Sequence, residues 1–144
     1  MMNYLPFVSA ESSQPRRGTR WQRVALVFVF FWFLLGGIAH FVLTEQEMRI
    51  VPPSLPDARD IVLIAGFFEL LGAFGLLLPW TRRAAGWGLF LLTLCVTPAH
   101  LYMIHAHEQF GLPLWLLWLR LPVQVVLLWL IVWGSRWRAA RPLY

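Results

Sequence analysis

Four long apolar stretches alternate with short polar segments along the chain. Each stretch has about 20 residues, which is enough for a helix to cross the roughly 30 Å hydrocarbon core of a membrane. The stretches predict helices at about residues 24–43, 57–80, 82–104 and 113–134. The expected fold class is therefore all-α, an integral membrane four-helix bundle, with polar tails at residues 1–23 and 135–144.

A few polar side chains interrupt the apolar stretches, namely His40, Glu69, His100, Arg120 and Gln124. At about 1.5 Å of rise per residue, Glu69 lies about 12 Å beyond the predicted start of its membrane span at Ile61. By the same measure, Arg120 lies about 9 Å beyond the predicted start of its membrane span at Leu114. Because successive helices alternate in direction, His40, Glu69, His100 and Arg120 fall in the outer half of the membrane, and Gln124 shares the helix face of Arg120 four residues further on. We expect them to line one polar pocket for a ligand.

Glu69 and Arg120 are predicted to form a buried ion pair. Gly66 and Ala73 lie three and four residues from Glu69, so the carboxylate shares the helix face that packs most closely against other helices. A guanidinium matches a carboxylate in shape, and neither charge is stable alone in hydrocarbon. The alternative is that this pair only fixes the packing of the second and fourth helices.

The third apolar stretch carries a polar stripe and a proline. Thr93, Thr97 and His100 follow one another at spacings of four and three, so they lie on one face of a helix. Pro98 removes a backbone donor within this stripe. The sequence therefore predicts a kink in the third helix.

Histidines on different helices of a bundle could ligate haem iron. His40 and His100 are such a pair, but no other mark of a haem protein is present, and we do not expect haem. His105 and His107 have only Glu108 as an acidic neighbour and no cysteine beside them. We therefore predict no metal site.

Composition and charge support a membrane protein. The chain is 59% hydrophobic and 13% charged, against roughly 25% charged residues in a soluble domain. Its net charge of +5 comes from 12 arginines, which lie mainly at the ends of the apolar stretches. They gather before the first, between the second and third, and after the fourth stretch, so we expect both termini in the cytoplasm and the chain in the inner membrane. We expect no nucleic-acid partner.

Six segments resemble the DoxX family of small four-helix bacterial membrane proteins. They are residues 37–41 (GIAHF), 49–53 (RIVPP), 66–72 (GFFELLG), 81–85 (TRRAA), 98–103 (PAHLYM) and 116–124 (LLWLRLPVQ). His100 departs from this resemblance, because asparagine is expected after Pro-Ala in the family. The resemblance implies a redox-associated role linked to quinone.

The expected function is a quinone-binding or lipid-binding accessory subunit of a membrane redox system. Arg120, Gln124 and His100 would donate hydrogen bonds to the ligand, and Glu69 would orient Arg120 or carry a proton. Its expected partners are membrane lipid, a redox subunit or a second copy of the chain. Two alternatives stay open: a structural or assembly protein without a ligand, and a small lipid-modifying enzyme that uses His40 and Glu69 as acid and base.

Overall fold

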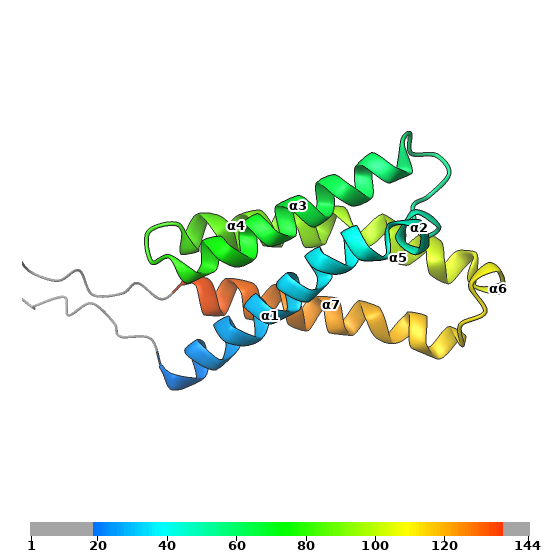
Figure 1. Cartoon of the computed structure of the whole chain (residues 1–144). Helices are drawn as coiled ribbons and strands as arrows, with labels where there is room; N and C mark the ends of the chain where they lie inside the picture. The colour runs from blue at the N-terminus through cyan, green and yellow to red at the C-terminus, as the bar shows by residue number, and fades with distance from the viewer. Residues whose placement is uncertain (1–18, 137–144) are drawn as a thin grey trace, which may run out of the picture.

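The computed structural model describes residues 19–136, and these residues form helices joined by short connections (Figure 1). In chain order the helices are α1 (Arg20–Val42), α2 (Thr44–Met48), α3 (Ala58–Leu77), α4 (Arg82–Cys95), α5 (Thr97–His105), α6 (His107–Phe110) and α7 (Leu114–Ser135). The all-α prediction is confirmed. Most of the two predicted tails lies outside the described residues, although α1 begins at Arg20 and α7 continues to Ser135.

Four helical segments of the described chain are long and apolar enough to cross a membrane. They are Arg20–Val42, Ala58–Leu77, Arg82–His105 and Leu114–Ser135. These bounds lie within a few residues of the four stretches predicted from sequence. The cytoplasmic placement of both termini stays a prediction.

The ends of the helices follow from local chemistry. Thr19 begins α1 with a reciprocal cap: its hydroxyl accepts from the Gln22 backbone N–H at 3.2 Å, and the Gln22 side-chain oxygen accepts from the Thr19 N–H at 3.0 Å. The C-terminal end of α3 is capped by Arg82, the first residue of α4. Its Nε donates to the carbonyl oxygen of Leu76 at 2.9 Å. This contact satisfies one of the carbonyls that a helix end leaves without a partner.

The third span is broken in two, as the proline predicts. Helix α4 ends at Cys95, Val96 forms a turn, and α5 starts at Thr97 with Pro98 in its first turn. Proline is well tolerated in a first turn because the N–H groups there have no partner inside the helix. The break leaves the last carbonyls of α4, including that of Thr93, in need of partners from elsewhere.

The four spans pack in a ring, with α1 against α3, α3 against α4, α4 against α7 and α7 against α1. We call the end where α1 begins and α7 ends the terminal end, and the opposite end, with α2 and α6, the distal end (Figure 1). The apolar core fills the terminal half of the ring. It consists of Leu26, Val29, Phe33, Ala73, Leu76, Leu89, Leu127 and Ile131.

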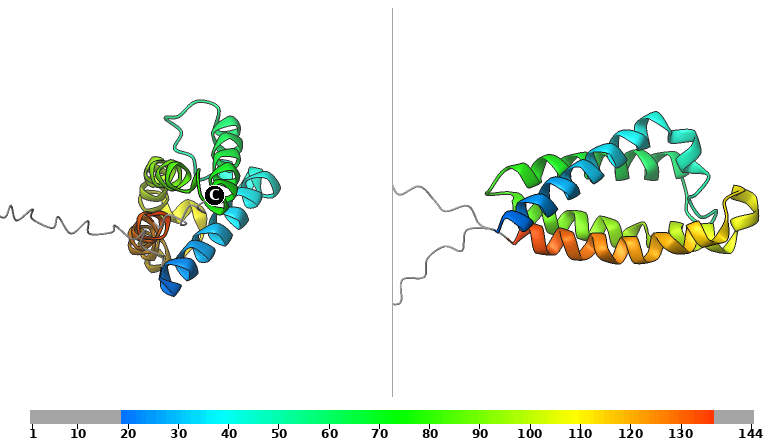
Figure 2. Two further views of the ribbon diagram at one scale, coloured as in Figure 1. Left: turned by 90° about the vertical axis from the view of Figure 1, so that its left-hand side faces the viewer. Right: turned by 90° about the horizontal axis from the view of Figure 1, so that it is seen from below.

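Toward the distal end the ring opens. Helix α5 packs mainly on α4 and α7, and it makes few or no close contacts with α1 and α3. Figure 2 shows α1 and α3 diverging from α5 and α7 in this half. The bundle therefore consists of a closed terminal half and two separated helix pairs in the distal half.

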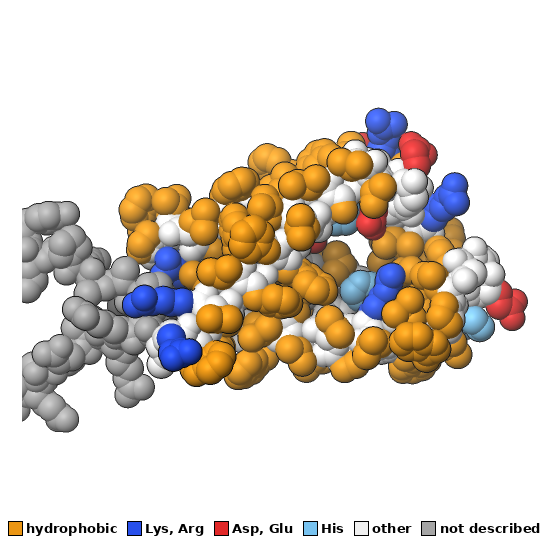
Figure 3. Space-filling model, turned by 60° about the horizontal axis from the view of Figure 1, so that its bottom comes forward, with side chains coloured by type: hydrophobic (Ala, Val, Ile, Leu, Met, Phe, Trp, Pro, Cys, Tyr) orange, Lys and Arg blue, Asp and Glu red, His pale blue; other side chains and the backbone are white. Residues whose placement is uncertain are grey.

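Large apolar side chains cover the outside of the helices (Figure 3). Trp80 is 78% exposed, Trp115 68% and Leu35 64%, and many other Leu, Phe and Val side chains are also exposed. Soluble monomers rarely show apolar patches of this extent. The surface and the four long apolar helices together indicate a multi-pass membrane protein.

Two short helices were not predicted. Helix α2 lies in the segment between the first two spans, and α6 in the segment between the last two. The Thr44 hydroxyl at the start of α2 donates to the His40 carbonyl oxygen at 2.7 Å, which ties α2 to the end of α1.

Candidate functional site

The crossing of α1 and α3 brings His40 and Glu69 together. His40 Nε2 lies 3.6 Å from Glu69 Oε1, and the two side chains are only 17% and 13% exposed. Two glycines make this approach possible. A Cβ on Gly36 would lie 2.6 Å from Glu69 Oε2, and a Cβ on Gly66 would lie 2.6 Å from the Cβ of His40. Larger side chains at either position would force the helices or the carboxylate to move.

The second nitrogen of His40 and the second oxygen of Glu69 lack partners. Both His40 Nδ1 and Glu69 Oε2 are buried atoms that form no hydrogen bond within the described part of the chain. Burying a polar group without a partner is costly, and most buried polar groups in proteins are hydrogen-bonded. These two atoms therefore mark a place where a polar ligand group would be favourable.

On the other helix pair, Gln124 links α7 to both halves of the broken span. Its Nε2 donates to the Thr93 carbonyl oxygen and to the Thr97 hydroxyl, both at 2.7 Å. Its Oε1 lies 2.8 Å from His100 Nδ1. Gln124 is 7% exposed. Its side chain therefore provides buried hydrogen-bond partners at the break at Val96, where the helix leaves backbone groups without partners.

This network determines the orientation of two side chains. A backbone carbonyl only accepts, so the Gln124 atom that faces Thr93 must be the amide nitrogen, and the atom that faces His100 must be the oxygen. His100 Nδ1 must then carry a proton. In its neutral form His100 is left with Nε2 as a hydrogen-bond acceptor.

Arg120 is half-buried on α7, and its Nη1 lies 3.0 Å from the sulfur of Met103 on α5. A thioether is a weak acceptor, whereas a guanidinium offers five N–H donors in a fixed plane. Met103 is 3% exposed, so it holds the arginine close to α5 without satisfying its hydrogen-bonding capacity.

The predicted ion pair between Glu69 and Arg120 is not formed. Within residues 19–136 the carboxylate of Glu69 lies beside His40, and Arg120 lies beside Met103. Each side chain contacts the helix that packs against its own, because α3 packs on α1 and α5 packs on α7. The opening of the distal half separates the two charges.

The predicted site residues thus form two groups on two helix pairs. His40 and Glu69 lie on α1 and α3, while His100, Gln124 and Arg120 lie on α5 and α7. Figure 3 shows a hollow in the apolar surface, with acidic, basic and histidine side chains around it. We call the region between the two helix pairs in the distal half, with His40, Glu69, His100, Arg120 and Gln124, the polar hollow. A role of these five residues in ligand binding stays a prediction.

An apolar groove runs along α1 and α7. It is lined by Phe28, Trp32, Leu119, Pro122, Val123, Val126, Leu127 and Leu130. Phe28 and Trp32 are followed at the same spacing of four by Gly36 and His40, so one stripe of α1 leads from the groove to the polar hollow. This groove could not be predicted from sequence, because its lining residues on α1 and α7 are apolar like those that face lipid.

No three histidine, cysteine or acidic side chains of residues 19–136 come together as a metal site. His40 contacts Glu69, and His100 contacts Gln124.

A family model matches residues 26–138, which is most of the chain. Its description is "Domain of unknown function (DUF8561)". The chain belongs to this family. The match covers α1 from Leu26 onward, α2 to α7 and all five predicted site residues, so these belong to the shared DUF8561 domain. No curated protein and no solved structure matched the chain significantly.

Membership of the DUF8561 family carries no activity with it. The family comparison assigns no DoxX domain to the chain, and the resemblance to DoxX proteins stays a prediction. The geometry of the polar hollow is therefore the main evidence on function.

Sequence reasoning missed three contacts that shape this site. Gly36 makes room for Glu69, Met103 contacts Arg120, and the Thr93 carbonyl accepts from Gln124. Met103 lies three residues after His100 and extends the polar stripe, a spacing that sequence analysis could have used. The other two contacts depend on how the helices are rotated about their axes, which spacing along one helix does not determine.

Proposed function

We propose that this protein binds an amphipathic, quinone-like lipid in the polar hollow and acts as an accessory subunit of a membrane redox system. The observation that carries the proposal is the pair of unpartnered buried atoms, His40 Nδ1 and Glu69 Oε2, in the half of the bundle where the helix pairs separate. A ligand head group placed there would supply the partners that the chain itself does not.

The donors and acceptors around the hollow suit a head group with oxygen atoms. The Arg120 guanidinium would donate to a carbonyl oxygen, since its only described contact is with a thioether. Glu69 Oε2 would accept from a hydroxyl group, so the site offers partners to both the carbonyl and the hydroxyl form of a quinone. A bound quinone would supply reversible electron and proton transfer to a partner protein.

The apolar groove between α1 and α7 suits the tail of the same molecule. All of its lining side chains are apolar, and its α1 stripe leads to the polar hollow. Ligand sites in proteins combine a mostly apolar wall with a few placed polar groups. The resemblance to DoxX proteins adds the link to redox chemistry, which the geometry alone does not provide.

Quinone binding to the purified full chain tests this proposal. Arg120→Ala should weaken the affinity for a soluble short-chain ubiquinone on the order of tenfold or more, because a charged donor to the head group is lost. Arg59→Ala is the matched control, since Arg59 is an exposed arginine at the start of α3. The measurement is a fluorescence or calorimetric titration in mild detergent.

If Arg120→Ala binds as tightly as the control, the assignment of Arg120 to the site is wrong. If neither the wild type nor the control binds quinone or another lipid, the whole ligand-binding proposal is wrong. The chain must elute as a single folded species in each case, which gel filtration and far-UV circular dichroism establish.

A structural role is the second candidate, and the Gln124 network favours it. Three hydrogen bonds from one side chain hold α4, α5 and α7 together across the break at Val96. An assembly protein would need such rigidity and no ligand. It predicts that substitutions at His40, Glu69 and Arg120 change thermal stability and leave no binding activity to lose.

A further inference from the structure

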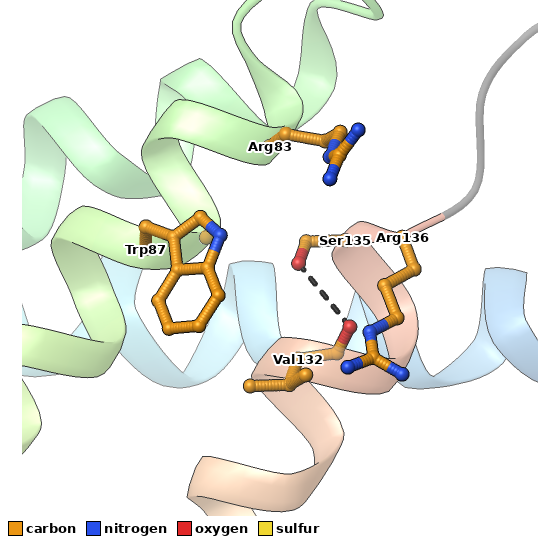
Figure 4. Close-up of a pocket in the computed structure, with 6 residues that line it drawn as sticks. Arg83, Trp87, Val132, Ser135 and Arg136 are labelled. Carbon is orange, nitrogen blue, oxygen red and sulfur yellow. Dashed lines mark hydrogen bonds between the residues drawn. The ribbon is translucent and has the colours of Figure 1, made fainter.

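We propose that a second site, at the terminal end, binds the phosphate group of an anionic membrane lipid. The site is a pocket between α4 and α7 that is lined by Arg83, Gly86, Trp87, Val132, Ser135 and Arg136. We call it the headgroup pocket. Figure 4 shows Arg83 and Trp87 on α4 facing Ser135 and Val132 on α7, with Arg136 on the other side of Ser135 from Arg83. The pocket is independent of the polar hollow.

Close packing of the two helices forms the floor of this pocket. A Cβ on Gly86 would lie 2.5 Å from both the Cβ and the Oγ of Ser135, so α4 and α7 touch here. Ser135 is only 6% exposed. Its hydroxyl donates to the Val132 carbonyl oxygen at 3.4 Å, which is a long hydrogen bond. A phosphate oxygen at closer range would be a better acceptor for that hydroxyl.

The charges around the pocket are of one sign. Among residues 19–136, Arg20, Arg23, Arg82, Arg83 and Arg136 lie at the terminal end, and the acidic residues lie toward the distal end, apart from Glu69 near the middle of α3. Arg82 is buried and donates to carbonyls at the end of α3. Arg83 and Arg136 are exposed and border the pocket. A guanidinium binds phosphate through two parallel N–H donors.

The pocket also lies where lipid phosphates would be found. Arginines and tryptophans mark the ends of membrane spans, where they meet the headgroup layer. Trp87 is 54% exposed beside the pocket, and Arg20 lies over the ring of the neighbouring Trp21 at 5.4 Å from its centroid. Basic pockets between membrane helices are known to hold anionic headgroups. Exposed apolar side chains continue from the pocket at helical spacing, with Leu91 after Trp87 on α4 and Trp129 before Val132 on α7. They would contact the acyl chains, which favours a lipid over free phosphate.

Native mass spectrometry of the full chain in detergent tests this site, with phosphatidylglycerol and phosphatidylcholine of the same chain length as probes. The wild type should retain phosphatidylglycerol in preference to phosphatidylcholine. The double variant R83Q/R136Q should weaken the affinity for phosphatidylglycerol on the order of tenfold, since both guanidinium groups that border the pocket and would bind the lipid phosphate are lost. The control R20Q/R23Q removes the same charge from the same end and should leave that affinity essentially unchanged.

Three outcomes would overturn the proposal. The first is equal retention of the two lipids by the wild type, and the second is an equal loss in both double variants, which would show general attraction by charge. The third is displacement of phosphatidylglycerol by excess inorganic phosphate, which would make free phosphate the ligand. If R83Q/R136Q does not fold, the single variant R136Q, at the exposed end of α7, decides by the same comparison with a several-fold loss expected.

Discussion

Gly36 determines how closely the carboxylate of Glu69 approaches α1. A methyl group at this position would meet Glu69 Oε2 at 2.6 Å, and the next two nearest atoms also belong to Glu69. The carboxylate is at the end of a flexible side chain, so it would turn away rather than push the helices apart. The position of Glu69 next to His40 therefore depends on the absence of one methyl group.

Gly36→Ala should accordingly weaken ligand binding in the polar hollow several-fold and cost little thermal stability, because it displaces an acceptor and not the helix. Gly88→Ala is the matched control, since a Cβ there meets nothing within 4 Å. The control should bind normally and gain about 0.5–1 kcal/mol of stability from the better helix former. Quinone titration and thermal unfolding of both variants give the comparison. Identical binding by the two variants would show that Gly36 has no part in the site.

At the scale of the element, the break at Val96 creates the polar surface of the third span. A continuous helix would bond all its carbonyls internally, whereas the interrupted one presents the Thr93 carbonyl to α7. Gln124 is the side chain that meets this need. The break and the glutamine thus depend on each other, although they lie on different spans.

Replacing Gln124 with leucine should therefore destabilise the bundle by about 1–3 kcal/mol, because the Thr93 carbonyl keeps only the long hydrogen bond from the Thr97 hydroxyl at 3.5 Å and His100 loses its partner. Gln46→Leu is the control, since Gln46 is exposed in α2 and should change stability little. The midpoint of thermal unfolding in detergent, followed by circular dichroism, measures both. Gln124→Leu at wild-type stability would contradict the role assigned to this network.

At the scale of the molecule, the membrane makes part of this structure predictable. The thickness of the hydrocarbon sets the length of each span, so apolar runs located all four spans to within a few residues. Pro98 marked the break in the third span because its missing N–H acts locally. The small residue Gly66 indicated a close approach of helices, and it lies with Gly36 at the crossing of α1 and α3.

The partners of the polar residues were harder to predict. Sequence position gives the depth of Glu69 and Arg120 but not which neighbouring helix each one faces, and the expected pair joined α3 and α7, which lie on opposite sides of the ring. The short helices α2 and α6 were missed because a helix of four or five residues is marginal without its tertiary contacts. Rotation of helices and contacts in connecting segments are properties of the assembled ring.

The whole molecule is thus a ring of spans with a closed terminal half and an open distal half. The closed half carries the apolar core and, at its surface, the headgroup pocket. The open half carries His40 Nδ1 and Glu69 Oε2, which form no hydrogen bond within residues 19–136. This division places the proposed ligand site away from the apolar core that holds the ring together.

Photochemical labelling by a quinone analogue tests the central claim most directly. The full chain, in nanodiscs, is irradiated with an azido-quinone, digested and mapped by mass spectrometry, with and without excess unlabelled quinone. We expect competed labels on the peptides of α1, α3 and α7 that surround His40, Glu69 and Arg120. Labels spread evenly over the exposed tryptophans and leucines of the outer faces, and unchanged by the competitor, would contradict a quinone site in the polar hollow.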